Sequence, residues 1–136
     1  MTEEQITLVQ RTWRLLRPID PQLLSNVFLT RLELEGSSWR PLASFRLKGE
    51  AAALIDEFSM IIARLNQPEA TNIRLLSLAT HYLPDVISPQ QILYLGRALM
   101  WTIQQALGTD WTPEVEQAWR QCYFDMGEIL TRNGKW

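Results

Sequence analysis

The sequence predicts an all-α fold in one domain, residues 1–136, from three observations. Apolar residues recur at intervals of three and four along most of the chain, which is the period of an amphipathic helix. Ser, Thr, Asp and Pro stand where these patterns begin, and Gly or Pro stands where they end. No segment alternates polar and apolar residues for long enough to predict a strand. We therefore expect helices packed on helices around a single core.

The first two predicted helices are bounded by capping residues and prolines. Thr2 is a candidate N-cap with Gln5 three residues later, and Arg-Pro at 17–18 ends the first helix. Pro21 opens the second helix, which ends at the Gly-Ser-Ser run 36–38. Each helix has an apolar inner face, formed by Ile6, Val9, Trp13 and Leu16 in the first and by Leu24, Val27, Phe28 and Leu32 in the second.

The middle of the chain predicts a short helical turn, residues 39–42, and two further helices, residues 47–65 and 71–83. Asn-Gln-Pro at 66–68 separates these two helices, and Pro84 ends the second because proline cannot continue a helix. The residues that the first of them is expected to bury are Ala51, Leu54, Ile55, Phe58, Ile61 and Ile62.

Two long helices complete the chain. Ser88, Pro89 and Gln91 provide the N-cap, first position and capping box of a helix that ends before Gly108. Thr-Pro at 112–113 opens the last helix. The expected inner faces are Ile92, Leu95, Leu99 and Ile103, then Val115, Trp119, Cys122, Met126 and Ile129.

Composition excludes several classes of function. The net charge is -2 without a basic stripe, so a nucleic-acid partner is not expected. The apolar runs are too short to span a membrane, and the first residues do not form a signal peptide. The single cysteine, Cys122, lies on an apolar face and predicts an inert buried thiol in a reducing, cytoplasmic setting. One histidine and one cysteine form no catalytic triad or zinc site, so the sequence does not predict an enzyme.

Four short motifs resemble those of the single-domain bacterial globins. They are 29–32 (LTRL), 40–42 (RPL), 95–103 (LGRALMWTI) and 111–115 (WTPEV). In that family an RPLF corner, a VGEALLWTL-like helix and a WTPEV-like helix start recur at similar distances, and the resemblance covers nearly the whole chain. It implies a globin fold of about seven or eight helices in a three-over-three sandwich, with a central heme pocket.

The positions that hold heme in the family carry unusual residues here. By the resemblance, the corner Phe becomes Ala43, with Phe45 the nearest ring, the distal Gln or His becomes Glu50, and the proximal ligand becomes Tyr82. His81 lies one residue before that position, about 100° away around a helix, so the two side chains cannot point at the same spot. By the resemblance, the apolar distal wall positions are retained as Leu29 and Leu54, and we expect Leu29, Leu54, Phe58 and Leu99 around one central cavity.

These departures argue against an oxygen carrier. An ionised Glu50 accepts hydrogen bonds only and cannot donate one to bound oxygen. Tyr82 must lose its proton to bind iron, which costs about 4 kcal/mol at neutral pH before the metal offsets it. The resulting phenolate favours ferric iron, whereas reversible oxygen binding needs ferrous iron.

Three hypotheses follow. The leading one is a sensory or binding module without heme, with an apolar small molecule or a protein as partner, monomeric or homodimeric. In it Tyr82 fills vacated space, Glu50 is a solvated residue at a helix start, and Phe58 and Leu99 are ordinary core. The alternative is a protein that binds heme b, with ferric iron held by Tyr82, or by His81 after a one-residue shift, for redox, oxygen or nitric oxide chemistry. The third is a structural protein that dimerises through its last two helices.

Overall fold

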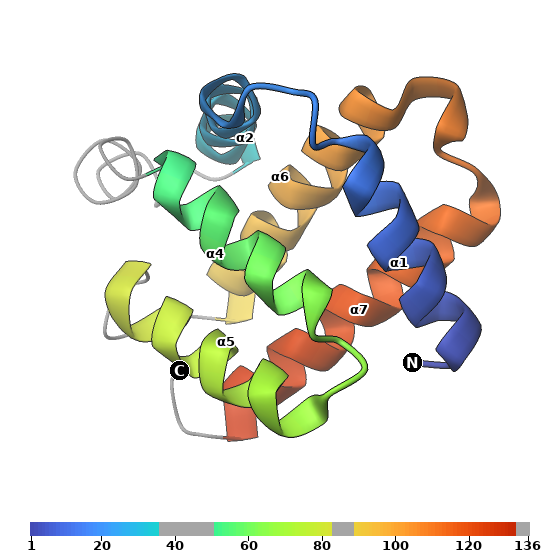
Figure 1. Ribbon diagram of the computed structural model, residues 1–136. Helices are drawn as coiled ribbons and strands as arrows, with labels where there is room; N and C mark the ends of the chain where they lie inside the picture. The colour runs from blue at the N-terminus through green and yellow to red at the C-terminus, as the bar shows by residue number, and fades with distance from the viewer. Residues whose placement is uncertain (36–50, 83–88, 133–136) are drawn as a thin grey trace.

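The computed structural model describes residues 1–35, 51–82 and 89–132, and within these ranges it contains helices and no strand. The predicted all-α class is therefore confirmed (Figure 1). The α-helices of the described ranges are α1 (Glu3–Leu15), α2 (Pro21–Glu35), α4 (Ala51–Ala63), α5 (Pro68–Tyr82), α6 (Pro89–Leu107) and α7 (Pro113–Arg132). The 3-10 turn η3 (Gly108–Asp110) joins the last two.

Local capping explains why several helices begin and end where the sequence predicts. Thr2 and Gln5 form the expected capping box, because the Gln5 N–H donates to Thr2 Oγ1 at 3.1 Å and the Thr2 N–H donates to Gln5 Oε1 at 2.9 Å. The Val115 N–H donates to Thr112 Oγ1 at 3.3 Å at the start of α7. Gly108 ends α6 with φ at 57°, a left-handed conformation that glycine adopts without strain.

One predicted boundary was wrong. Helix α5 begins at Pro68, three residues before the predicted start at 71, because proline is well suited to the first position of a helix. The Thr71 hydroxyl then donates to the Arg64 carbonyl and to the Gln67 carbonyl, which ties the start of α5 to the end of α4. The predicted turn at 39–42, the beginning of the helix predicted from 47, and Ser88 lie outside the described residues.

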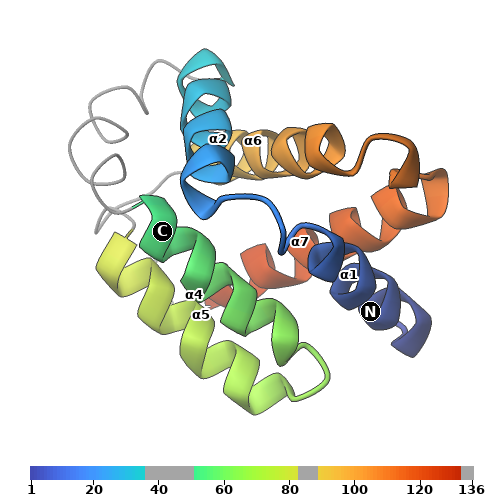
Figure 2. The ribbon, with the colours of Figure 1, turned by 45° about the horizontal axis from the view of Figure 1, so that its top comes forward.

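The helices pack both on their neighbours in sequence and on helices far along the chain. Helix α1 packs against α7 and α4, and α2 packs against α4 and α6. Helix α5 lies along α4 and also contacts α7 (Figure 2). Every described helix therefore contributes to one shared interior.

A cluster of three aromatic rings forms the centre of the core between α1, α4 and α7. The centroids of the Trp13 and Phe58 rings lie 5.1 Å apart, and Trp119 lies 6.0 Å from Trp13 and 6.3 Å from Phe58. Both indoles are hydrogen-bonded, since Trp119 Nε1 donates to Thr12 Oγ1 at 3.0 Å and Trp13 Nε1 donates to Ser59 Oγ at 2.9 Å. The hydrogen bonds orient the rings, and the apolar contacts hold the three helices together.

Most of the residues predicted for the inner faces are buried, and the exceptions lie at the edges of the packed faces. Only partly buried are Ile6, Val27, Leu95, Leu99 and Ile129. Val27 is the informative exception, because it lies toward the outer side of α2, away from the side packed on α4 and α6. The side chains of Ala51, Leu54 and Ile92 lie outside the described part of the chain.

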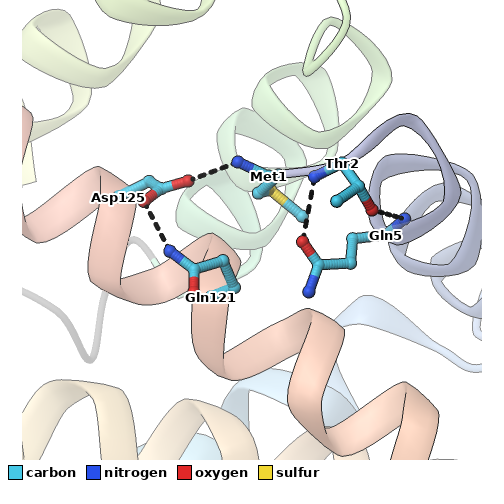
Figure 3. Close-up of polar contacts among 5 residues, drawn as sticks. All are labelled: Met1, Thr2, Gln5, Gln121 and Asp125. Carbon is cyan, nitrogen blue, oxygen red and sulfur yellow. Dashed lines mark hydrogen bonds and ion pairs between the residues drawn. The ribbon is translucent and has the colours of Figure 1, made fainter.

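The start of α1 is attached to α7 by polar contacts (Figure 3). The Met1 ammonium donates to Asp125 Oδ2 at 3.2 Å, while Gln121 Nε2 donates to Asp125 Oδ1 at 2.9 Å. These contacts continue the α1–α7 packing outward from the aromatic cluster.

Candidate functional site

Three of the residues predicted around a central cavity are described with their side chains. Leu29 on α2 and Phe58 on α4 are buried, and Leu99 on α6 is half-buried and packs against the core. Because α2 packs on both α4 and α6, these three helices bring the residues to one interior. The other predicted site residues are not described in full. For Leu54, His81 and Tyr82 the structure describes the helix but not the side chain, and Ala43, Phe45 and Glu50 lie outside the described residues.

The Phe58 side chain packs against two tryptophan rings. Its ring meets Trp13 nearly edge-on and stacks on Trp119 at an interplanar angle of 23°. A ring held from two sides in this way contributes to the core of the domain. This environment matches the interpretation of Phe58 as a core residue.

Helix α5 supplies the geometry that bears on the choice between Tyr82 and His81. Its buried residues are Thr71, Leu75 and Leu78, spaced four and then three residues apart. With about 100° of turn per residue, position 82 follows Leu78 by about 40° toward the side of Leu75. Position 81 lies about 60° from Leu78 on the opposite side. Helical geometry therefore places position 82 in line with Thr71, Leu75 and Leu78, and position 81 to one side of that line.

The single thiol has no sign of reactivity. Cys122 is buried on α7, and burial together with the nearby Asp125 carboxylate raises its pKa to about 12, against a smaller lowering by the N-terminal ammonium. At neutral pH the group is a neutral thiol, which is a poor nucleophile and a poor metal ligand. The predicted inert, buried cysteine is confirmed in its burial.

Sequence reasoning missed the close crossing of α6 and α7. A Cβ atom added at Gly96 would clash with Cε2 of Tyr123, so the tyrosine ring occupies the space that a side chain at 96 would need. Burial raises the pKa of the Tyr123 hydroxyl, with the Gly96 N–H opposing the shift. The sequence did contain a signal for this crossing, because Gly96 lies inside a strongly helical pattern and such a glycine often has a packing reason, here the close approach of another helix.

A second feature missed from sequence is an ionic cluster that joins the end of α2 to α6. Arg31 Nη2 lies 2.9 Å from Glu35 Oε1, and Arg97 Nη1 on α6 lies 4.0 Å from Glu35 Oε2. The Arg31 guanidinium also lies 5.1 Å from the centroid of the Trp101 ring. Because the Glu35 side chain is only 14% exposed, this cluster is better shielded from water than an ordinary surface pair.

Glu35→Gln is expected to lower the free energy of unfolding by about 1 kcal/mol, because it removes the shared negative charge between two arginines. Urea unfolding at low and high salt measures the effect, which should shrink in high salt. Glu116→Gln is the matched control, since Glu116 pairs with Arg120 at 3.6 Å on the exposed side of α7 and should change stability very little. Equal effects of the two substitutions would show that the α2–α6 cluster has no special contribution.

No protein-family model matches this chain. In the described ranges, no helix has a stretch long and apolar enough to cross a bilayer.

Proposed function

We propose that the chain is a globin-fold binding module that acts as a sensor or partner-binding domain, without the heme chemistry of an oxygen carrier. The observation that carries the proposal is the register of α5: by helical geometry, position 82 lies in line with the buried residues Thr71, Leu75 and Leu78. Position 81, which holds the only histidine of the sequence, lies about 60° to one side of Leu78. A globin pocket built on this register has no imidazole at the proximal position.

The helix contacts support the globin part of the proposal. Helices α1, α4 and α5 are joined by the α1–α4 and α4–α5 contacts, and α2, α6 and α7 are joined by the α2–α6 and α6–α7 contacts. Contacts of α1 with α7, α2 with α4, and α5 with α7 connect the two sets. Two packed sets of three helices agree with the three-over-three sandwich that the sequence motifs imply.

Histidine-ligated heme does not fit this register. Leu29, Leu75 and Leu78 are buried apolar residues that would suit an apolar ligand, but helical geometry directs positions 81 and 82 about 100° apart. Placing His81 on the buried face requires α5 to rotate by that amount, which would expose part of its present apolar face to water. The loss of the imidazole therefore favours a ligand other than an ordinary heme.

A ferric heme held by the Tyr82 phenolate is the second candidate, because the same register favours Tyr82 over His81. A phenolate is an anionic oxygen ligand that stabilises oxidised iron. This candidate replaces oxygen carriage with redox, oxygen or nitric oxide chemistry, and it shares the fold and the register with the first.

Absorption spectroscopy tests the proposed module directly. Protein purified from an iron-replete host is expected to show no Soret band at one heme per chain, and titration with hemin is expected to show no saturable one-to-one binding. The physical reason is the missing imidazole at the buried register of α5. A stoichiometric Soret band in the purified protein would overturn the heme-free proposal.

If hemin does bind, two variants decide between the ligands. The second candidate predicts ferric heme whose phenolate-to-iron charge-transfer band is lost in Tyr82→Phe and kept in His81→Ala. Loss of the ferric spectrum only in His81→Ala would show that the ligand-bearing face is offset by one residue, and the register argument would be wrong.

A further inference from the structure

Met60 on α4 is the most exposed methionine of this chain. The sequence contains four methionines, and all of them lie within the described ranges. Met60 is 42% exposed, whereas Met1 and Met100 are half-buried and Met126 lies in the core at 5% exposure. A dissolved oxidant therefore reaches the sulfur of Met60 more readily than the sulfur of Met126.

The sulfur of Met60 has a cationic neighbour on the next helix. Arg74 Nη1 on α5 donates a hydrogen bond to Met60 Sδ at 3.1 Å, and the same nitrogen lies 3.7 Å from Glu57 Oε2 on α4. Because α4 and α5 lie side by side, this arginine bridges the two helices (Figure 2). A thioether sulfur is a weak acceptor, so the bridge to Met60 is weak while the sulfur is reduced.

We propose that Met60 is a site of reversible oxidation by hydroperoxides, at which Arg74 binds the sulfoxide oxygen and so strengthens the α4–α5 contact. Oxidation converts the apolar thioether into a polar sulfoxide, whose oxygen accepts hydrogen bonds more strongly than the sulfur does. The Arg74 guanidinium is already beside the sulfur, and a rotation about the Cγ–Sδ bond brings the new oxygen to it. The site goes beyond the proposed function and does not depend on it, because the register of positions 81 and 82 involves neither Met60 nor Arg74.

The reaction balances with hydrogen peroxide as the only co-reactant. A lone pair of Met60 Sδ forms a bond to one peroxide oxygen, and the O–O bond breaks. The other oxygen leaves with its hydrogen as hydroxide and takes the proton from the oxygen now bound to sulfur, which gives the sulfoxide and water. Sulfur loses two electrons, and the peroxide gains them. The positive charge of Arg74 beside the sulfur favours the departing hydroxide.

The expected change in stability is opposite to the usual one. Oxidation of a methionine commonly disrupts packing, because a polar group enters an apolar contact. Met60 differs because it is already exposed to water and because a charged donor lies at its sulfur. The sulfoxide therefore loses little packing and gains a charge-assisted hydrogen bond across the two helices.

Peptide mapping by mass spectrometry tests the site. The folded chain is treated with hydrogen peroxide, and the sulfoxide fraction at each methionine is followed over time. Met60 is expected to be oxidised about tenfold or more faster than Met126, because burial keeps the oxidant from the core. Methionine sulfoxide reductases added afterwards are expected to restore the reduced mass. Equal rates at Met60 and Met126, or a Met60 sulfoxide that the reductases leave unchanged, would overturn the proposal.

Thermal unfolding tests the role of Arg74. Oxidation at Met60 is expected to raise Tm by about 2 °C, the size expected for one charge-assisted hydrogen bond near the surface. The gain should be lost or reversed in Arg74→Leu, which keeps an apolar side chain and removes the donors. Glu57→Gln is the matched control, since it removes the ion pair but keeps Arg74, and it should keep the gain.

Met60→Leu protein given the same treatment should show no change in Tm, which assigns the gain to Met60 alone. Circular dichroism of each variant before treatment confirms that it is folded. A Tm that does not rise in the oxidised wild-type chain, or that rises equally in Arg74→Leu, would contradict the strengthened α4–α5 contact.

Discussion

Trp119→Ala is expected to lower the free energy of unfolding by about 3–5 kcal/mol, the largest single effect in this chain. Trp119 is 1% exposed and its ring contacts both Trp13 and Phe58, so removing it leaves a cavity where α1, α4 and α7 meet. Urea unfolding followed by far-UV circular dichroism measures the loss and does not depend on tryptophan fluorescence.

Two further variants separate the packing of Trp119 from its hydrogen bond. Thr12→Val removes the acceptor of the indole N–H and should cost about 1–3 kcal/mol, because a buried donor is left without a partner. Thr12→Ser keeps the hydroxyl and should recover part of that stability. Trp111→Ala serves as the control on a partly buried tryptophan outside the three-ring cluster and should cost less than Trp119→Ala. An equal loss from Trp111→Ala and Trp119→Ala would contradict the central role of the cluster.

Gly96→Ala is the second large effect and is expected to lower the free energy of unfolding by up to about 2 kcal/mol. The added methyl group would lie within 2.7 Å of three ring atoms of Tyr123, so the two helices or the partly buried ring must move. Overpacking of this kind costs roughly 1–3 kcal/mol or more, and the better helix propensity of alanine offsets about 1 kcal/mol of it. Thermal and urea unfolding of Gly96→Ala measure the net result.

A double-mutant cycle with Tyr123→Ala identifies the cause. In the Tyr123→Ala background, Gly96→Ala should be neutral or stabilising, because the ring that it would meet is gone. Gly108→Ala is a useful contrast, since no atom lies within 4 Å of its added Cβ and its cost of about 1 kcal/mol comes from the left-handed φ alone. Simple additivity of Gly96→Ala and Tyr123→Ala would show that the helices do not meet at this point.

Local rules in the sequence predicted the helical class and most of the helix ends. The Thr2–Gln5 capping box and the end of α6 at Gly108 depend on neighbouring residues only, so both could be predicted from the sequence. The rules are ambiguous at Pro68, since proline both ends one helix and begins the next. The structure resolves this ambiguity in favour of a longer α5.

For the candidate site, the sequence predicted only the helical register of positions 81 and 82 on α5. Spacing alone predicted that Tyr82 and His81 point in different directions, and the resemblance to globins favoured position 82. The burial of Thr71, Leu75 and Leu78 supplies an independent reason to favour position 82, which required knowing the side of α5 that packs on its neighbours.

By itself, the sequence determined the helical class, the caps and the apolar stripes, because these features arise from interactions between residues a few positions apart. Only the tertiary structure decided that Tyr123 covers Gly96 and that Glu35 joins α2 to Arg97. These contacts join helices that are distant in sequence. Their partners depend on how the helices cross, and helical periodicity does not specify a crossing.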